Sequence, residues 1–236
     1  MTDLKRQAAQ KALELLHSGM LIGLGSGSTT AIFIDLLGEK LDSGDLKNLV
    51  GVPTSRESER QARKLGIPLT KLADNNLLDL VVDGADEVDP NLNLIKGLGK
   101  ALLREKFIEI HTRRLVIIVD ESKLVQRLGQ HAPLPVEIVK FEWQTTVSWL
   151  NTLECRAELW VQENGVPYIT DNGNYLVRCW FNNKNPNDST IGISDPYELA
   201  NKLIERPGVL EHGLFLDLAD QVIVAGMDGI KILGRS

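Results

Sequence analysis

The residues best suited to chemistry lie between Asp83 and Lys106, in the sequence DGADEVDPNLNLIKGLGKALLREK. An apolar run at 77–82 precedes them and is typical of a buried strand, and the segment ends in a helical pattern. It combines closely spaced carboxylates, a lysine before two glycines and a glutamate within the helical pattern. Such groups can move a proton on a small anionic substrate that is rich in oxygen.

Glu105 is the most informative of these residues. It lies along an apolar stripe with Leu98, Ala101 and Ile108 at helical spacing, so its carboxylate should be partly removed from water. Burial raises the proton affinity of a carboxylate, which suits a general base near neutral pH. The alternative is an exposed glutamate paired with a neighbouring lysine or arginine, and spacing alone does not exclude it.

The carboxylates Asp83, Asp86, Glu87 and Asp89 have several possible roles. A solvated acidic loop, a helix capped by aspartate and a magnesium site are all compatible with this composition. Asp83 follows directly on the apolar run, which favours a positioned carboxylate. No histidine or further acidic cluster is placed to complete a metal shell, so we expect no metal ion.

Two lysines could bind anionic groups. Lys96 precedes Gly97 and Gly99, where the backbone can approach a ligand closely and the ammonium could stabilise an oxyanion. Lys123 follows the acidic residues at 120–121 and could hold a phosphate as a point charge. Each lysine taken alone is more often an exposed surface residue.

The loop Gly25–Thr30 has the composition of an anion-binding turn. It joins an apolar run at 20–24 to a helical pattern at 31–37, so free N–H groups and the helix dipole would face a ligand. It lacks the spacing of dinucleotide and nucleotide loops, so a small phosphate or carboxylate fits better. An ordinary tight turn between strand and helix is the alternative.

These segments require a scaffold of alternating strands and helices. Strands are expected at 20–24, 49–52, 77–82 and 115–119, with a shorter one at 69–72, and helices at 4–17, 31–37, 56–65 and 100–112. This order predicts an α/β fold with a mostly parallel, Rossmann-like sheet flanked by helices. Ligands bind at the carboxyl ends of such strands, where the loops 25–30, 53–55, 83–87 and 120–123 are expected.

The pattern changes near Gly129. Strands at 136–139, 157–161 and 175–181 and helices at 143–150 and 195–204 predict a smaller α+β domain over 130–207, which we expect to contribute to oligomer contacts. Two further runs, 221–225 and 230–233, flank a hairpin signal and should return to the first sheet. The α/β catalytic domain would then comprise 1–129 and 208–236.

Composition excludes several classes of function. The net charge of −6 argues against a general nucleic-acid binder. The first residues carry charges throughout and no apolar stretch of roughly 18 residues occurs, so we expect no signal peptide, no membrane partner and a cytoplasmic location. Cys155 and Cys179 are expected to be reduced thiols.

Four motifs together resemble ribose-5-phosphate isomerases of the A type: GLGSGSTT at 23–30, VDGADEVD at 82–89, KGLGKALLREK at 96–106 and DESK at 120–123. Three further segments are also similar: PLPVEI at 133–138, TDNGN at 170–174 and MDGIKIL at 227–233. The resemblance therefore covers nearly the whole chain. It implies interconversion of ribose 5-phosphate and ribulose 5-phosphate without metal or organic cofactor, by a dimer or tetramer.

The resemblance also implies a role for each motif. Glu105 would shuttle a proton between C2 and C1 through an enediolate. Asp83 would assist ring opening and hydroxyl proton transfer, with Asp86 beside it. Lys96 would offset charge on the enediolate oxygen, together with backbone donors near Gly97.

Substrate binding would fall to the remaining motif positions. Lys123, and also Lys5, would hold the phosphate. Leu98 and Lys100 stand where the pattern has glycine and a small residue, which would narrow the pocket and add a charge. The other substrate-binding positions would be Ser26, Gly27, Ser28, Thr29, Gly84, Ala85 and Gly99.

Two other functions stay open at this point. A sugar-phosphate-binding regulator on the same fold would keep the loop and Lys123 but would need no base. An acyl or coenzyme A transferase of related architecture would use a glutamate as nucleophile. If the leading hypothesis of an isomerase is correct, the protein is expected to bind small-molecule sugar phosphates.

Overall fold

The computed structural model describes residues 2–74, 77–181 and 191–235. They form two compact units, of which the first comprises Met1–Ala85, Arg104–Lys123 and Asp217–Ser236. The second comprises Asp86–Leu103 and Leu124–Leu216. These bounds differ from the expected division at 129/130 and 207/208, because short strands flanking the expected smaller domain pair inside the second unit.

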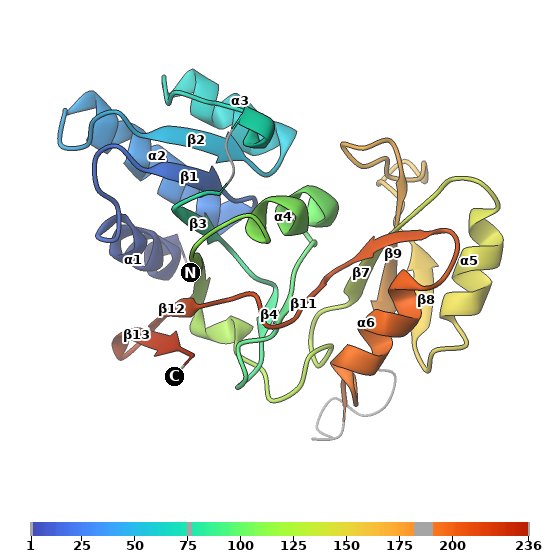
Figure 1. The fold of residues 1–236 in the computed structure, drawn as a ribbon. Helices are drawn as coiled ribbons and strands as arrows, with labels where there is room; N and C mark the ends of the chain where they lie inside the picture. Colours follow the sequence, from blue (N-terminus) through green and yellow to red (C-terminus); the bar gives the residue numbers. More distant parts are fainter. Residues whose placement is uncertain (1, 75–76, 182–190, 236) are drawn as a thin grey trace. The chain divides into compact units, whose positions relative to one another are not determined.

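The first unit contains a six-stranded sheet in the order β13-β12-β6-β3-β1-β2 (Figure 1). All neighbouring pairs are parallel except β12 and β13, which form the expected hairpin. The prediction of a mostly parallel sheet that the end of the chain rejoins is therefore confirmed. The strands are β1 (Leu21–Leu24), β2 (Val50–Pro53), β3 (Leu80–Asp83), β6 (Leu115–Asp120), β12 (Gln221–Gly226) and β13 (Gly229–Gly234).

Helices cover this sheet. Alternate residues of the strands, such as Ile22, Val82 and Ile118, pack with apolar residues of α1 and α2 in one core. The intervening residues, such as Val81 and Ile117, are equally buried, as expected of a parallel sheet. The helices of this unit are α1 (Thr2–Leu13), α2 (Ser28–Asp42), α3 (Arg56–Lys64) and α4 (Leu102–Glu109), with single turns η1 (Leu72–Asp74) and η2 (Glu121–Lys123).

The second unit has the expected α+β character. Its main sheet is antiparallel, in the order β10-β7-β9-β8, and a small sheet has the order β11-β5-β4. Helix α6 begins where expected, because Asp195 accepts hydrogen bonds from the amides of Tyr197 and Glu198. The elements are β4 (Glu87–Val88), β5 (Leu94–Ile95), β7 (Leu134–Ile138), α5 (Trp143–Leu150), β8 (Arg156–Leu159), β9 (Tyr175–Trp180), α6 (Pro196–Ile204), β10 (Val209–His212) and β11 (Leu214–Phe215).

Some expected element boundaries were wrong. The strand at 69–72 is reduced to one bridge between Leu69 and Gly51, followed by η1. The first helix ends at Leu13 rather than at residue 17, and the chain continues in turns in which the amides of Leu15 and Leu16 donate hydrogen bonds to carbonyls three residues earlier. The helix expected from residue 100 begins at Leu102, because Lys100 has a left-handed backbone with φ of 70°. In the described ranges, no helix has the length and apolar character needed to cross a membrane.

Candidate functional site

The turn after β1 lies against the end of β3. Parallel pairing places Leu24 opposite Val82, and the amide of Gly25 donates a 3.0 Å hydrogen bond to the carbonyl of Val82. A Cβ added to Gly25 would lie 2.2 Å from Cγ of Asp83. Glycine at position 25 therefore allows the turn and the carboxylate to lie together.

The carboxylate of Asp83 is fully buried and held in place by its neighbours. Its Oδ1 accepts hydrogen bonds from the amides of Ser26 at 2.9 Å and Gly84 at 2.6 Å. The hydroxyl of Thr30 donates to the same oxygen at 3.3 Å. These donors come from the two strand-end loops and from the first turn of α2, so the expectation of a positioned carboxylate is confirmed, and a solvated one is excluded.

The start of α2 is partly exposed. Gly27 is its N-cap, with φ of 99°, and makes no side-chain cap hydrogen bond. Gly27 and Ser28 are exposed and Thr29 is half-buried, so the backbone of the first helical turn is accessible. Nζ of Lys5 donates to Oγ of Ser28 at 2.8 Å, which brings a positive charge to this turn.

Glu105 lies on α4 and is 3% exposed. The helical pattern therefore identified a buried glutamate correctly, and the alternative of an exposed ion pair was wrong. Glu109, one turn later on the same helix, is also buried. Burial removes water from a carboxylate, which is the setting that a base for C–H abstraction requires.

The end of β6 supplies the last loop of the first unit. Asp120 is buried, and its Oδ1 accepts hydrogen bonds from the amide and hydroxyl of Ser122. Lys123 follows in the single turn η2 and is half-buried. The segments 25–30, 53–55 and 120–123 thus follow parallel strands of one sheet, as predicted. Of the expected loop 83–87, residues 83–85 do so too, whereas Asp86 and Glu87 belong to the second unit.

Asp86 and Lys96 belong to the second unit. Oδ2 of Asp86 accepts a 2.9 Å hydrogen bond from the amide of Leu98, and its own amide donates to the carbonyl of Ile95. Lys96 is buried, and its Nζ lies 5.4 Å from the ring centroid of Phe215. The alternative of an exposed surface lysine is therefore wrong for Lys96.

The glycine segment after Lys96 has one sterically restricted position. Gly97 has φ of 108°, and an added Cβ would lie 2.8 Å from Cβ of Leu102. Leu98 is half-buried and Gly99 is exposed. In the first unit, Gly84 and Ala85 directly follow Asp83 and are half-buried. Gly97 is buried, whereas the other four positions are at least partly exposed.

Glu87 and Asp89 are buried in the second unit, where their carboxylates accept hydrogen bonds from backbone amides. The carboxylate of Glu87 accepts hydrogen bonds from the amides of Gly129 and His131, both at 2.6 Å, and of Ala132 at 2.7 Å. Burial raises the pKa of Glu87, and the three backbone donors partly oppose that rise. Oδ1 of Asp89 accepts from two amides of its own turn. The solvated acidic loop was therefore a wrong interpretation of these two residues.

Sequence reasoning missed two hydroxyl groups. Thr30 bonds Asp83, and Oγ1 of Thr54 lies 2.8 Å from Oγ of Ser26. Thr30 lies in the first turn of α2 and Thr54 in the loop after β2, and only the fold shows that both are completely buried. In the part of the chain that the structure describes, no group of three His, Cys, Asp or Glu side chains is arranged to hold a metal ion.

Comparison with known sequences identifies similar proteins along the whole chain. Residues 50–229 match the profile of the family described as ribose 5-phosphate isomerase A (phosphoriboisomerase A). A probable ribose-5-phosphate isomerase 2 of Arabidopsis thaliana is 46% identical over 238 residues, covering 99% of this chain and 87% of the relative. Ribose-5-phosphate isomerase A of Pyrococcus horikoshii is 44% identical over 235 residues, covering 99% and 98%.

Solved structures are similar to the same extent. Ribose 5-phosphate isomerase from Plasmodium falciparum has a TM-score of 0.93 and 38% identity, with complete coverage of both chains. A D-ribose-5-phosphate isomerase in complex with phospho-erythronic acid has a TM-score of 0.92 and 44% identity, covering 99% of this chain and 98% of that one.

Proposed function

The chain belongs to the ribose 5-phosphate isomerase A family, and from this premise we propose how its residues interconvert ribose 5-phosphate and ribulose 5-phosphate. The enzyme is an aldose–ketose isomerase that works through an enediolate. The observation that carries the proposal is the burial of Glu105, of which 3% is exposed. The mechanism needs a base that competes with water for a proton on carbon, and a desolvated carboxylate has that property.

Glu105 removes the proton from C2 of the open-chain aldose, and the electron pair of the broken C–H bond forms the C1–C2 double bond of the enediolate. In this step the π electrons of the C1 carbonyl move to O1. The same carboxyl group then delivers the proton to C1, where the C1–C2 π pair accepts it, and an electron pair of O2 forms the C2 carbonyl. The proton of the O2 hydroxyl is transferred to O1, which becomes the C1 hydroxyl. Asp83 assists ring opening and these hydroxyl transfers, and Asp86 is the second carboxylate proposed for them. The orientation of Asp83 by three donors supports this role.

Lys96 and the backbone N–H at Gly97 offset the negative charge that develops on the enediolate oxygen. A buried ammonium is more effective in this role than an exposed one, because less water screens it. Gly84, Ala85, Leu98 and Gly99 contact the substrate through their accessible backbone positions.

The phosphate group binds at the start of α2. The proposed donors are the hydroxyl of Ser26 and the backbone N–H groups of Gly27, Ser28 and Thr29, with Lys5 and Lys123 as counter-charges. The proposal is supported by the N-cap without a side-chain hydrogen bond and by the ammonium of Lys5 beside Ser28.

We also propose a homodimer or homotetramer that acts in the cytoplasm, as the family resemblance of the motifs implies, with residues 130–207 contributing to subunit contacts. Light scattering coupled to gel filtration tests the assembly, and cell fractionation tests the location. A monomer at working concentration, or a signal in a membrane or organelle fraction, would contradict the respective proposal.

The reaction is tested by following purified protein with ribose 5-phosphate in heavy water by NMR. The expected result is ribulose 5-phosphate, with deuterium entering C1 of the ketose and C2 of the recovered aldose. Binding of ribose 5-phosphate without exchange at C2 would instead support a non-catalytic regulator. A glutamyl thioester trapped with an acyl-coenzyme A would support a transferase.

A further inference from the structure

Lys100 ends the glycine segment of the second unit in an unusual backbone conformation. Its φ of 70° lies in the left-handed region, which residues other than glycine rarely adopt. Its amide donates a 2.8 Å hydrogen bond to the carbonyl of Gly97, which closes the segment into a tight turn. A lysine in this conformation needs a compensating interaction elsewhere.

The side chain of Lys100 provides that interaction. Its Nζ lies 4.5 Å from the ring centroid of Tyr168 and 5.2 Å from that of Trp160. Both distances fall within the range of a cation–π contact. The ammonium therefore contacts both rings, which accounts for the extra charge that the sequence adds beside the glycine segment.

The two rings are held next to each other by the backbone. The amide of Tyr168 donates to the carbonyl of Trp160 at 2.8 Å, and the amide of Trp160 donates to Leu176 of β9 at 2.7 Å. The guanidinium of Arg178 lies 5.1 Å from the ring centroid of Trp160. Trp160 thus contacts a cation of its own sheet as well as Lys100.

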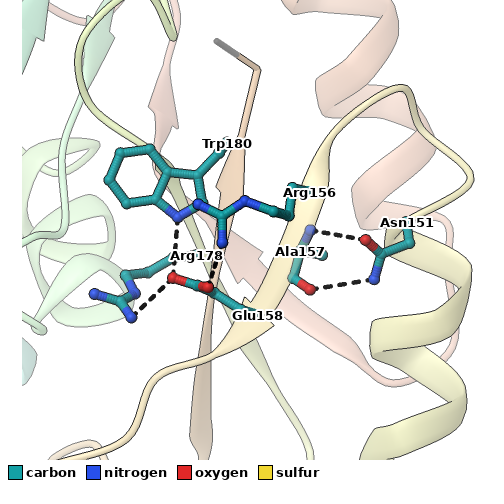
Figure 2. Close-up of polar contacts among 6 residues, drawn as sticks. All are labelled: Asn151, Arg156, Ala157, Glu158, Arg178 and Trp180. Carbon is teal, nitrogen blue, oxygen red and sulfur yellow. Dashed lines mark hydrogen bonds and ion pairs between the residues drawn. The ribbon is translucent and has the colours of Figure 1, made fainter. Parts of the chain in front are cut away.

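A polar network fixes Arg178 in turn (Figure 2). Arg178 pairs with Glu158 at 2.9 Å, and the indole N–H of Trp180 donates to the same carboxylate oxygen at 3.1 Å. Arg156 binds the other oxygen at 2.6 Å. Since Glu158 lies opposite Arg178 and Arg156 opposite Trp180 in the β8–β9 ladder, the network is built on rigid strands.

We propose that Lys100 is a positioning residue, which sets the backbone of Gly97, Leu98 and Gly99 for the enediolate by anchoring this turn to Tyr168 and Trp160. The inference rests on the proposed function, which places the Gly97 amide near the developing oxyanion. Lys100 itself touches no substrate, because its ammonium is engaged by the two rings. Loss of the anchor should weaken contacts made in the transition state more than contacts made on binding.

The test compares Lys100→Met with Lys100→Arg in the purified enzyme. The Met variant keeps chain length but loses the charge, and we expect kcat to fall about tenfold while KM stays within about twofold. The Arg variant keeps a cation for the rings and should retain most of the activity. The inhibition constant of phospho-erythronic acid, whose carboxylate carries the negative charge near C1, should rise in parallel with the loss of kcat.

A matched control is Lys140→Met. Nζ of Lys140 lies 5.5 Å from the ring centroid of Tyr175. The substitution therefore removes a cation–π contact from the same unit, but one that does not involve the glycine segment. We expect its kcat to equal that of the unaltered enzyme. An equal loss of kcat in the Lys100→Met and Lys140→Met variants would overturn the inference.

A double-mutant cycle separates anchoring from general destabilisation. Tyr168→Leu should lower kcat, and adding Lys100→Met to it should lower kcat by a smaller factor than Lys100→Met does alone, because the contact with Tyr168 is already lost and only the contact with Trp160 remains. Additive losses, or an unaltered kcat in Lys100→Met, would overturn the inference while the enzyme stays active. An unaltered protein that shows no isomerisation would overturn the proposed function instead. If Lys100→Met does not fold, the outcome for Lys100→Arg decides: full loss of kcat in a folded Arg variant contradicts the anchor.

Discussion

The amide of Ser26 donates a 2.9 Å hydrogen bond to Oδ1 of Asp83, across 57 positions of sequence. This bond connects the hydroxyl-rich turn after β1 with the acidic turn after β3. The two turns are adjacent because β1 and β3 are parallel neighbours in the sheet. One hydrogen bond therefore links the proposed phosphate-binding turn to the carboxylate that is proposed to transfer protons.

Asp83→Asn separates the chemical role of this carboxylate from its role as a hydrogen-bond acceptor that holds the two turns together. Asparagine keeps an oxygen that can accept from Ser26, Gly84 and Thr30, but it carries no charge and takes up no proton. We expect kcat to fall by roughly a hundredfold or more, and the free energy of unfolding in urea to change by less than about 1 kcal/mol. Asp83→Ala should lose both activity and stability. A fully active Asn variant would remove Asp83 from proton transfer.

Gly25→Ala tests the close approach of the turn to Asp83. A methyl group 2.2 Å from Cγ of Asp83 must displace the carboxylate or the turn. We expect at least a tenfold loss of kcat/KM, with a loss of stability of about 1–3 kcal/mol, as for overpacked sites. The matched control is Gly234→Ala in the same sheet, where the nearest neighbour lies 3.8 Å away. Equal effects of the two changes would contradict this account.

Glu87 should make stability depend on pH. Burial raises its pKa above the ordinary value of 4.5, so the folded protein binds more protons at this group than the unfolded chain does. Its contribution to stability is therefore present below pH 4.5 and is lost as the pH rises through the folded pKa. Glu87→Gln removes this dependence.

Urea unfolding at about pH 5 and about pH 8 measures the effect of Glu87→Gln. The variant should be less stable at both values, because an amide cannot satisfy the donors from Gly129, His131 and Ala132. We expect the difference from the unaltered protein to shrink as the pH rises. A difference that grows with pH would show that the hydrogen bonds outweigh desolvation.

Treatment with a chelator tests whether turnover needs a metal cation in addition to the lysine side chains. Lys96, Lys5 and Lys123 supply the positive charges in the proposed reaction, so turnover should be unchanged after treatment with EDTA. Initial rates before and after dialysis measure this directly. Activity that is lost on chelation and restored by magnesium would show that a cation takes part.

Sequence periodicity predicted the parts of the site that depend on local structure. The alternation of apolar runs and helical patterns identified the parallel sheet, and strand ends identified the loops that carry Asp83 and Lys123. The position of Glu105 on an apolar stripe identified its burial. These features follow from one strand or helix at a time, so they can be read from neighbouring residues.

Periodicity could not predict contacts between segments that are far apart in the sequence. Glu87 looks like Asp83 in the sequence, yet its partners lie more than forty positions away, in the segment 129–132. The rings near Lys100 likewise belong to Trp160 and Tyr168, far along the sequence from the glycine segment. The short strands β4 and β5 carry too few residues for a periodic signal.

Glu105→Gln, measured in heavy water, addresses the general base itself. The substitution keeps size and polarity but removes the group that accepts the proton from carbon. Glu109→Gln is the matched control, because Glu109 is a second buried carboxylate on the same helix. Its exchange rate should stay close to that of the unaltered enzyme.

For Glu105→Gln we predict ribose 5-phosphate binding within about threefold of the unaltered enzyme, and a fall in C2 deuterium exchange by at least about a thousandfold. Exchange at C2 that continues at a near-normal rate in this variant would contradict Glu105 as the base.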